Sequence, residues 1–272
     1  MNPLPRRRVL LSWSSGKDSA WTLKVLLEDP DTEVVGLLTT VNAGNDRVAM
    51  HATRRAILEA QARAARLPLH VVPLPWPCSN EIYEQAMGQA LRAAIADGVT
   101  HIAFGDLFLE DVRAYRIRQL EGSGLQPIFP IWGEPTLELA RRMVDAGLEA
   151  IVTCVDPKQL PAEFVGRRFD HAFLDALPEG VDPCGENGEF HTCVTAGPMW
   201  PGRIDLTVGE RVERDGFCYA DLMPAASKSA SAQPARASPS LSSAFGSAAT
   251  SSSTARRNVP RFARRCAAPP RR

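Results

Sequence analysis

Residues 9–20 read Val-Leu-Leu-Ser-Trp-Ser-Ser-Gly-Lys-Asp-Ser-Ala, and this stretch decides the fold class of the chain. An apolar run ends at Ser12, a small polar loop follows, and residues 18–28 then repeat apolar side chains with the period of a helix. A strand that enters a helix through such a turn leaves the first N–H groups of the helix without intrahelical partners. With the helix dipole, these groups favour an anion, most naturally a phosphate. Gly16 permits close backbone approach, Lys17 adds a positive charge, and the serines add hydroxyl donors.

Beyond this turn, strand-like and helix-like stretches alternate. The apolar patterns predict strands at 33–40, 69–72 and 101–104, and helices at 50–66, at 80–97 and in the stretch that ends near residue 120. This alternation predicts an α/β fold, with a doubly wound parallel sheet of HUP-like or Rossmann-like type that carries helices on both faces.

After Gly122-Ser123-Gly124 the pattern loosens, and we place a domain boundary there. Residues 1–123 then form a nucleotide-type domain, and residues 124–224 form a second, smaller α+β domain. Within the second domain we expect strands at 128–131, 150–155, 203–208 and 218–222, and helices at 136–146 and 170–177. The last two of these strands predict an antiparallel edge.

The formal net charge of zero hides an uneven distribution of charge. Residues 225–272 carry nine basic and no acidic side chains, so residues 1–224 carry 22 basic against 31 acidic ones. The acidic body argues against nucleic acid as the partner of the fold. The basic tail is rich in Ser, Ala, Pro and Arg, and its composition predicts disorder.

The cysteines and the N-terminal residues argue against a disulfide-rich, zinc-binding, membrane or secreted protein. The six cysteines include no C-x-x-C pair, so we expect neither a disulfide framework nor a zinc site, although Cys184, His191 and Cys193 lie close together. No apolar run approaches the roughly 20 residues of a membrane helix, and the N-terminal run is too short for a signal peptide. We expect a cytoplasmic protein with no membrane partner.

The loop S-S-G-K-D-S at residues 14–19 is not a Walker A loop, because Leu11 stands where that motif has its first Gly and Asp18 where it has Ser or Thr. It also lacks the G-x-G-x-x-G of a dinucleotide fingerprint. It resembles the S-G-G-x-D-S pyrophosphate loop of the ATP-pyrophosphatase superfamily. Ser15 stands where the common form has Gly, which raises a question about the backbone there. Two further segments narrow the resemblance: residues 105–116 read GDLFLEDVRAYR, and residues 182–192 read DPCGENGEFHT. Together the three resemble the diphthine–ammonia ligase family over about residues 9–222.

The resemblance implies an ATP-dependent, amide-forming ligase that uses ATP and Mg²⁺. Such an enzyme adenylates a substrate carboxylate, releases pyrophosphate and transfers ammonia; the acceptor is a small molecule or a protein side chain. The implied ATP-binding residues are Ser14, Ser15, Gly16, Lys17, Asp18, Ser19, Thr39, Thr40, Gly105 and Asp106. The implied catalytic residues are Lys17, Glu186, Asn187, Glu189 and His191, and the weakest assignments are Arg113, Tyr115 and Arg116 as substrate contacts.

Several alternatives stay open at this stage. Asp18 either holds Mg²⁺ or fixes the loop, and either Glu189 or His191 serves as the base, unless the glutamates only cap a turn and His191 only packs. An adenylating tRNA-modification enzyme and a non-catalytic ATP or AMP sensor are the rival functions. The acceptor, the ammonia source and the oligomeric state, a homo-oligomer included, are not fixed by the sequence.

Overall fold

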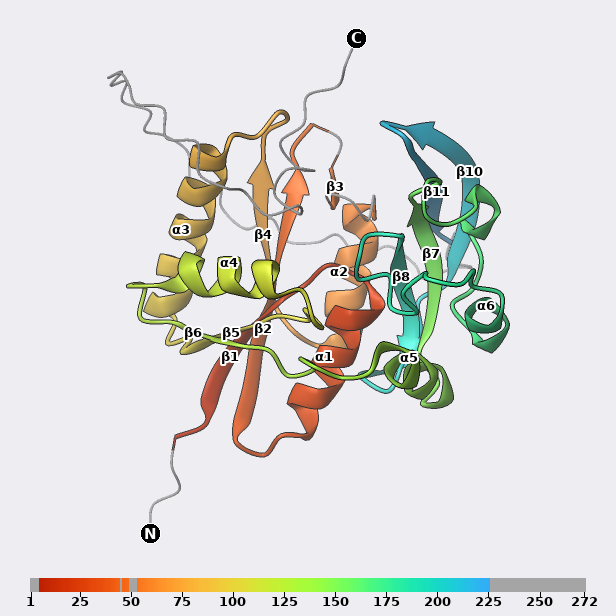
Figure 1. Cartoon of the computed structure of the whole chain (residues 1–272). Helices are drawn as coiled ribbons and strands as arrows, with labels where there is room; N and C mark the ends of the chain where they lie inside the picture. The colour runs from red at the N-terminus through yellow and green to blue at the C-terminus, as the bar shows by residue number, and fades with distance from the viewer. Residues whose placement is uncertain (1–4, 45, 49–52, 226–272) are drawn as a thin grey trace, which may run out of the picture.

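The computed structural model describes residues 5–44, 46–48 and 53–225 and contains two sheets side by side (Figure 1). The predicted disorder of the basic tail concerns residues outside this range. Within the described residues, no helix is both long and apolar enough to cross a membrane.

The first sheet is parallel apart from one short strand. Its strands are β1 (Arg7–Ser12), β2 (Thr32–Asn42), β3 (Arg47–Val48), β4 (Leu69–Leu74), β5 (His101–Ala103) and β6 (Gln126–Ile128). The parallel strands lie in the order β4-β2-β1-β5-β6, and β3 pairs antiparallel with the end of β2. The chain therefore starts at β1 in the middle of the sheet, adds β2 and β4 on one side, and then adds β5 and β6 on the other. The strand order reverses between β1 and β5.

Helices cover both faces of this sheet. They are α1 (Lys17–Glu28), α2 (Arg55–Ala65), α3 (Asn80–Ala96) and α4 (Glu110–Leu120). In Figure 1, α3 and α4 lie on the outer face, and α1 and α2 lie between the first sheet and the second. A parallel sheet with helices on both faces agrees with the predicted α/β class.

The second sheet is antiparallel and lies against α1 and α2. Its strands are β7 (Glu149–Val155), β8 (Phe190–Gly197), β9 (Trp200–Arg203), β10 (Leu206–Arg214) and β11 (Phe217–Pro224), in the order β10-β11-β7-β8-β9. Three helical elements belong to the same part of the chain: α5 (Thr136–Asp145), the 3-10 turn η1 (Ala162–Phe164) and α6 (His171–Asp175). The late strands form a full sheet with β7, where the sequence predicts only an antiparallel edge.

Two details of the chain differ from expectation. The single strand predicted at 203–208 is wrong, because β9 ends at Arg203 and β10 begins at Leu206. The boundary proposed at Gly122–Gly124 precedes β6, which still hydrogen-bonds to β5 in the first sheet. The switch from one sheet to the other therefore follows Ile128, and the division into domains stays a prediction.

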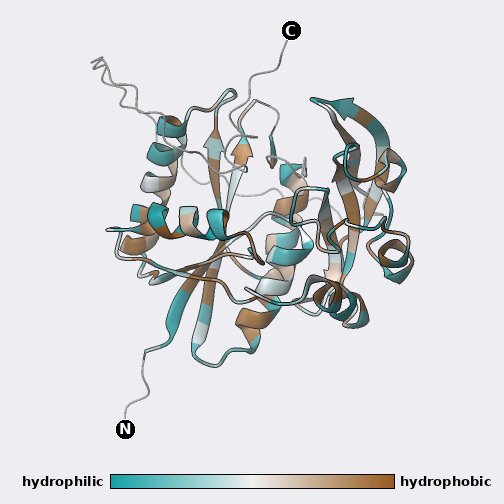
Figure 2. Ribbon diagram, in the orientation of Figure 1, coloured by the Kyte–Doolittle hydropathy of each residue, from teal (hydrophilic) through white to brown (hydrophobic). Residues whose placement is uncertain are grey.

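Strand β1 shows how the core is built on both faces of the first sheet. Val9 and Leu11 point into a cluster that continues through Leu58 of α2 to Val152 of the second sheet. Leu10 points the other way, into a cluster beneath α3 and α4. Figure 2 shows the resulting apolar strands at the centre of both sheets and the mostly hydrophilic β10 at the periphery.

Candidate functional site

A cavity of about 2470 Å³ opens where the parallel strands end. Its walls come from the β1–α1 turn, the end of β2, the β5–α4 loop, α3, residues 184–192 and the β10–β11 hairpin. Ligands of open α/β sheets bind at this edge, where the strand order reverses. The predicted site residues that line it are Ser14, Lys17, Asp18, Ser19, Thr39, Thr40, Gly105, Asp106, Tyr115, Arg116, Glu186, Asn187, Glu189 and His191. Ser15, Gly16 and Arg113 are not part of its lining.

Ser15 supports the turn from behind the cavity. Its φ is 74°, the left-handed region that glycine adopts without cost, and this answers the question raised by its sequence position. The side chain is fully buried, with its hydroxyl 2.8 Å from the Thr53 hydroxyl. The Ser15 carbonyl accepts hydrogen bonds from the Gln61 side-chain amide and from the Val194 N–H of β8. These bonds hold the turn in its strained conformation.

Ser14 and Ser19 present the hydroxyl face of the turn to the cavity. Their Oγ atoms lie 3.1 Å apart, and Ser19 Oγ also donates to the Gly16 carbonyl at 3.0 Å. Gly16 is the N-cap of α1, with extended backbone and no side-chain cap. The helix therefore begins directly beside two hydroxyls, as an anion site of this type requires.

The Lys17 ammonium lies inside the protein. It donates to Asp18 Oδ2 at 2.8 Å and to the Cys184 carbonyl oxygen, and it faces the rings of Phe169 and Phe190. Burial alone would lower the pKa of Lys17, but the carboxylates around it, above all Asp18, outweigh burial and raise the pKa. The side chain is therefore a buried cation between the β1–α1 turn and residues 182–192.

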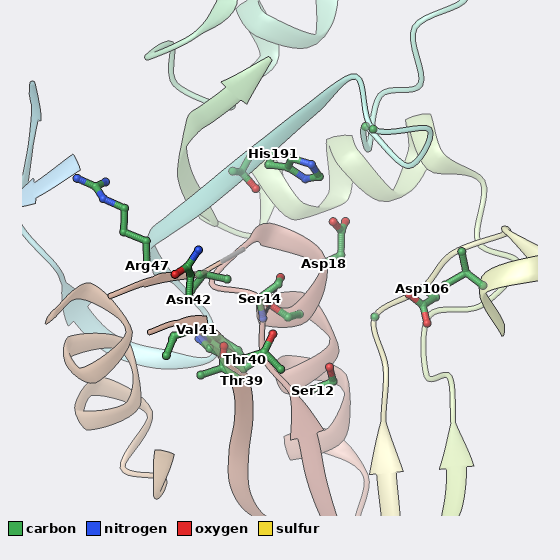
Figure 3. Close-up of a pocket in the computed structure, with 18 of the residues that line it drawn as sticks. Ser12, Ser14, Asp18, Thr39, Thr40, Val41, Asn42, Arg47, Asp106 and His191 are labelled. Atoms are coloured by element: carbon green, nitrogen blue, oxygen red, sulfur yellow. Dashed lines mark hydrogen bonds between the residues drawn. The ribbon is translucent and has the colours of Figure 1, made fainter. Parts of the chain in front are cut away.

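Asp18 points from the start of α1 into the cavity, on the side where His191 of β8 also points (Figure 3). One carboxylate oxygen binds Lys17, and the other, Oδ1, is buried and has no hydrogen-bond partner among the described residues. The same residues contain no group of three Asp, Glu, His or Cys side chains placed to hold a metal ion. Mg²⁺ often binds one or two carboxylates together with substrate phosphates, and Asp18 Oδ1 fits that kind of site.

The ends of β2 and β5 supply the far wall of the cavity. Thr39 is buried, and its hydroxyl oxygen has no hydrogen-bond partner in the described part of the chain, so it is available to a ligand. Gly105 allows the β5–α4 loop to approach α1, since a Cβ there would lie 3.0 Å from the Asp18 carbonyl carbon. Asp106 forms an ion pair with Arg116 at 3.4 Å, which fixes both side chains at the cavity wall.

Glu186 joins the second half of the chain to the β5–α4 loop. Its Oε1 accepts the Leu107 N–H at 2.9 Å. Burial raises the pKa of Glu186 to about 8, and the nearby Asp18 carboxylate adds to the rise. Glu186 is therefore a carboxyl group that holds or releases a proton near neutral pH.

Glu189 organises the loop that carries Glu186. Its Oε1 accepts from the Asp182 N–H at 3.0 Å and from the Asn187 amide at 3.1 Å. Its Oε2 is buried and has no hydrogen-bond partner within the described residues. His191 lies two residues further along the chain, on β8, where its backbone pairs with that of Cys154 on β7. One glutamate oxygen thus fixes the loop and the other is left for a ligand.

The three residues predicted to contact the substrate do not all lie at the cavity. Tyr115 and Arg116 line the cavity from α4. The Arg113 guanidinium instead packs over the ring of Trp132 at 4.7 Å and over Phe129 at 5.4 Å, outside the cavity lining. A substrate in this cavity would meet Arg116 and not Arg113.

Gln61 is a residue that sequence reasoning missed. It is fully buried on α2, accepts from Trp13 Nε1 at 3.0 Å, and donates to the carbonyls of Ser15 and Val194. A signal was present, because Gln61 falls on the same stripe of α2 as the buried Ile57 and Leu58. A polar residue inside an apolar stripe indicates a buried hydrogen-bond partner.

Comparisons with known proteins agree with this arrangement. Residues 135–223 match the family model of the diphthamide synthase C-terminal domain. Over 120 residues the chain is 25% identical to the diphthine–ammonia ligase of Rattus norvegicus, an alignment that covers 42% of this chain and 45% of that protein. The match therefore spans less than half of the relative's length. The chain is therefore similar to diphthine–ammonia ligase over part of its length, and its residues 135–223 match the diphthamide synthase C-terminal domain.

Proposed function

We propose that this protein is an ATP-dependent ligase that adenylates a carboxylate, releases pyrophosphate and forms an amide with ammonia. One observation carries the proposal: a single cavity is lined by the phosphate-type turn with Ser14 and Asp18 and also by Glu186 and His191 of the family-matched C-terminal region. A nucleotide and an acceptor can meet there. The doubly wound, Rossmann-like or HUP-like fold belongs to the same proposal and is supported by the strand order β4-β2-β1-β5-β6.

The size of the cavity favours a reaction between two bound molecules. Sites for one drug-sized ligand measure about 300–1,000 Å³. The cavity of about 2470 Å³ has room for ATP and for an acceptor beside it. A site that only senses a nucleotide needs no such second volume.

The proposed division of labour follows the cavity walls. Ser14, Ser19 and the start of α1 hold the phosphates as charge moves onto the departing pyrophosphate. Thr39 and Thr40 contact the nucleoside. Glu189 Oε2 or His191 takes the proton that ammonium loses when the amide forms. Bound by Asp18 Oδ1 and the phosphates, Mg²⁺ would neutralise charge on the leaving group.

The reaction class is tested with the full chain, ATP, Mg²⁺ and a panel of carboxylic acids. Hydroxylamine replaces ammonia in one arm, because it converts an acyl adenylate into a hydroxamate and AMP. We expect AMP and pyrophosphate in equal amounts, and a hydroxamate in the arm that contains the correct acid. Formation of ADP and phosphate would contradict the proposal, and ATP that binds but stays intact would favour a sensor.

Variants then locate the chemistry. Ser14→Ala combined with Ser19→Ala removes two hydroxyl donors and should weaken ATP binding about tenfold or more. Ser123→Ala is the matched control, because Ser123 lies on the turn after α4 and not in the cavity lining. Glu189→Gln and His191→Ala should abolish amide formation in at least one case. Wild-type turnover by both variants would show that neither Glu189 nor His191 is the base.

A further inference from the structure

We propose that Lys17 is a positioning residue that ties the phosphate turn to residues 184–192, and that it does not bind the phosphates of the nucleotide. This inference deepens the proposed function, because it concerns how that site is assembled. The contacts from which it is argued do not depend on the reaction.

Two of the three N–H donors of the Lys17 ammonium group already have acceptors within the protein. Lys17 is 2% exposed, and its Nζ contacts Asp18 Oδ2 and the Cys184 carbonyl oxygen. The ammonium group also faces two aromatic rings, whose centroids lie 5.4 Å away for Phe190 and 5.7 Å away for Phe169. Buried charges are stable only when paired and hydrogen-bonded, and cation–π contact adds to this pairing. A Lys17 side chain that swung out toward a phosphate would lose these contacts.

Lys17 also holds both ends of one segment. Its side chain binds the carbonyl of Cys184, and its backbone N–H donates to Thr192 Oγ1 at 3.1 Å. The candidate catalytic side chains Glu186, Glu189 and His191 lie between these two points. One residue of the phosphate turn therefore fixes the start and the end of the segment that the proposal assigns to amide formation.

A shift of Cys184 would be transmitted to Glu186. Only one residue separates them, and Glu186 is held on its other side by the Leu107 N–H at 2.9 Å. Without the Lys17 ammonium, the Cys184 carbonyl would be a buried acceptor that has lost its charged donor, which is unfavourable. The segment 184–192 would then relax away from Asp18. Glu186 would lose its fixed position between this segment and the β5–α4 loop.

The first experiment uses the wild-type chain and amine-specific labelling with formaldehyde and a borohydride reductant, read out by mass spectrometry. The comparison lysines are Lys24, which is paired with Glu28, and the exposed Lys158. We expect slow labelling of Lys17 both without and with saturating ATP and Mg²⁺. Fast labelling of Lys17 in the free protein together with protection by ATP would overturn the proposal, since that is the behaviour of a phosphate ligand.

The second experiment compares Lys17→Met with Lys24→Met. Both lysines lie on α1 and face aromatic rings. Lys24 lies 4.9 Å from the centroid of the Trp21 ring, but it is partly exposed and paired with Glu28, so it is the matched control. Alkylation of Cys184, which is 2% exposed, should rise at least tenfold in Lys17→Met only. The fully buried Cys154 and Cys193 serve as internal standards, because general unfolding would expose them as well.

Kinetics of the same variants separate positioning from phosphate binding. For Lys17→Met we expect kcat for AMP formation to fall at least tenfold while KM for ATP changes less than threefold. A large rise in KM with unchanged Cys184 alkylation would contradict the proposal. If the wild-type chain forms no AMP, the proposed function fails, yet both labelling experiments still decide the position of Lys17.

Discussion

Ser15 keeps a side chain in a backbone conformation that favours glycine, and its contacts explain how. The strain at a φ of 74° is opposed by the hydrogen bond to Thr53 and by two donors to its carbonyl. At Ser15 the hydrogen bond of the hydroxyl therefore stabilises the fold, whereas the positive φ destabilises it.

Two substitutions separate these effects. Ser15→Ala keeps the strain and loses the hydroxyl bond, so the free energy of unfolding should fall by about 1–2 kcal/mol. Ser15→Gly loses the same bond but relieves about 1 kcal/mol of strain, so its stability should lie closer to wild type. Urea denaturation measures both. A glycine variant less stable than the alanine variant would show that the backbone at Ser15 is not strained.

Glu186 makes stability depend on pH in a direction opposite to that of a salt-bridged carboxylate. Its pKa is raised from 4.5 to about 8, so between these values the folded chain holds a proton that the unfolded chain has lost. The contribution of Glu186 is complete below pH about 4.5 and is lost as pH rises through about 8.

Replacing the carboxyl by an amide should remove this dependence. Glu186→Gln keeps an oxygen for the Leu107 N–H, so its Tm should decline less than that of wild type between about pH 5 and pH 9. Glu163→Gln, at an exposed position in η1, is the control and should follow wild type. Parallel Tm curves for wild type and Glu186→Gln would show that Glu186 titrates normally.

At this scale the sequence located the β1–α1 turn but not the direction of its side chains. Ser14, Lys17, Asp18 and Ser19 all contribute to the cavity lining, and their role in binding phosphate stays a prediction. Lys17 turns inward because its partner is the carbonyl of Cys184, and no periodicity encodes a contact between residues 167 positions apart. Gln61 differs, because its place in the apolar stripe of α2 was a signal that the sequence did contain.

Helix α1 is held close to the β5–α4 loop by the absence of a side chain at Gly105. A Cβ there would lie 3.0 Å from the Asp18 carbonyl carbon and 3.0 Å from Thr22 Oγ1. The obstacle is backbone, which cannot rotate away. The helix and the loop therefore approach to a distance that only glycine allows.

Gly105→Ala should displace α1 and lower the free energy of unfolding by about 1–3 kcal/mol. Gly88→Ala is the matched control, because Gly88 lies inside α3 and its nearest neighbour is the flexible end of Arg92 at 3.4 Å. That control should be neutral or more stable by up to about 1 kcal/mol. Equal losses in thermal unfolding of the two variants would show that α1 has room to move.

Elements were predicted well where apolar periodicity was long. The helix predicted at 80–97 is α3, and the strand at 9–12 is the greater part of β1. The two-residue β3 has no pattern to detect, and it pairs only because β2 extends past the end of β1. The strand predicted at 128–131 appears as β6, shifted toward the N-terminus.

The two halves of the molecule are linked by an ion-pair group at the edge of the cavity. Asp221 of β11 accepts from Arg54 Nη2 at 2.6 Å and from Arg47 Nη1 at 2.9 Å. The two arginine hydrogen bonds, first that of Arg54, hold the pKa of Asp221 at about 2. The carboxylate thus joins the second sheet to β3 and to the residue before α2.

Asp221→Asn should lower the free energy of unfolding at pH 7 by about 1–2 kcal/mol, between the values for exposed and buried pairs. Because the pKa is depressed from 3.8, the stabilisation is present above pH about 4 and is lost as pH falls through about 2. The two proteins should therefore converge in acid when unfolding is followed by circular dichroism. Asp175→Asn, which breaks the exposed pair with Arg141, should change stability by less than about 0.5 kcal/mol. A difference between wild type and Asp221→Asn that persists at pH 2 would contradict the assignment.

The sequence predicted an α/β half and a mixed half but not how they meet. Strand patterns report which residues are apolar, whereas the partner sheet is chosen by contacts such as Arg54 with Asp221 that join distant parts of the chain. For the same reason, the strand predicted at 150–155 came without partners, and in the structure it is β7, the centre of the antiparallel sheet.

The hydrogen bonds from Val194 to Ser15 and from Lys17 to Thr192 have a consequence for how the chain can be divided. An N-terminal fragment would contain every residue of the S-S-G-K-D-S loop and still lack the β8 backbone that supports it. The region matched to the diphthamide synthase C-terminal domain would therefore influence ligand affinity at the turn through these hydrogen bonds. Exchanging that region between relatives should alter nucleotide handling as well as the choice of acceptor.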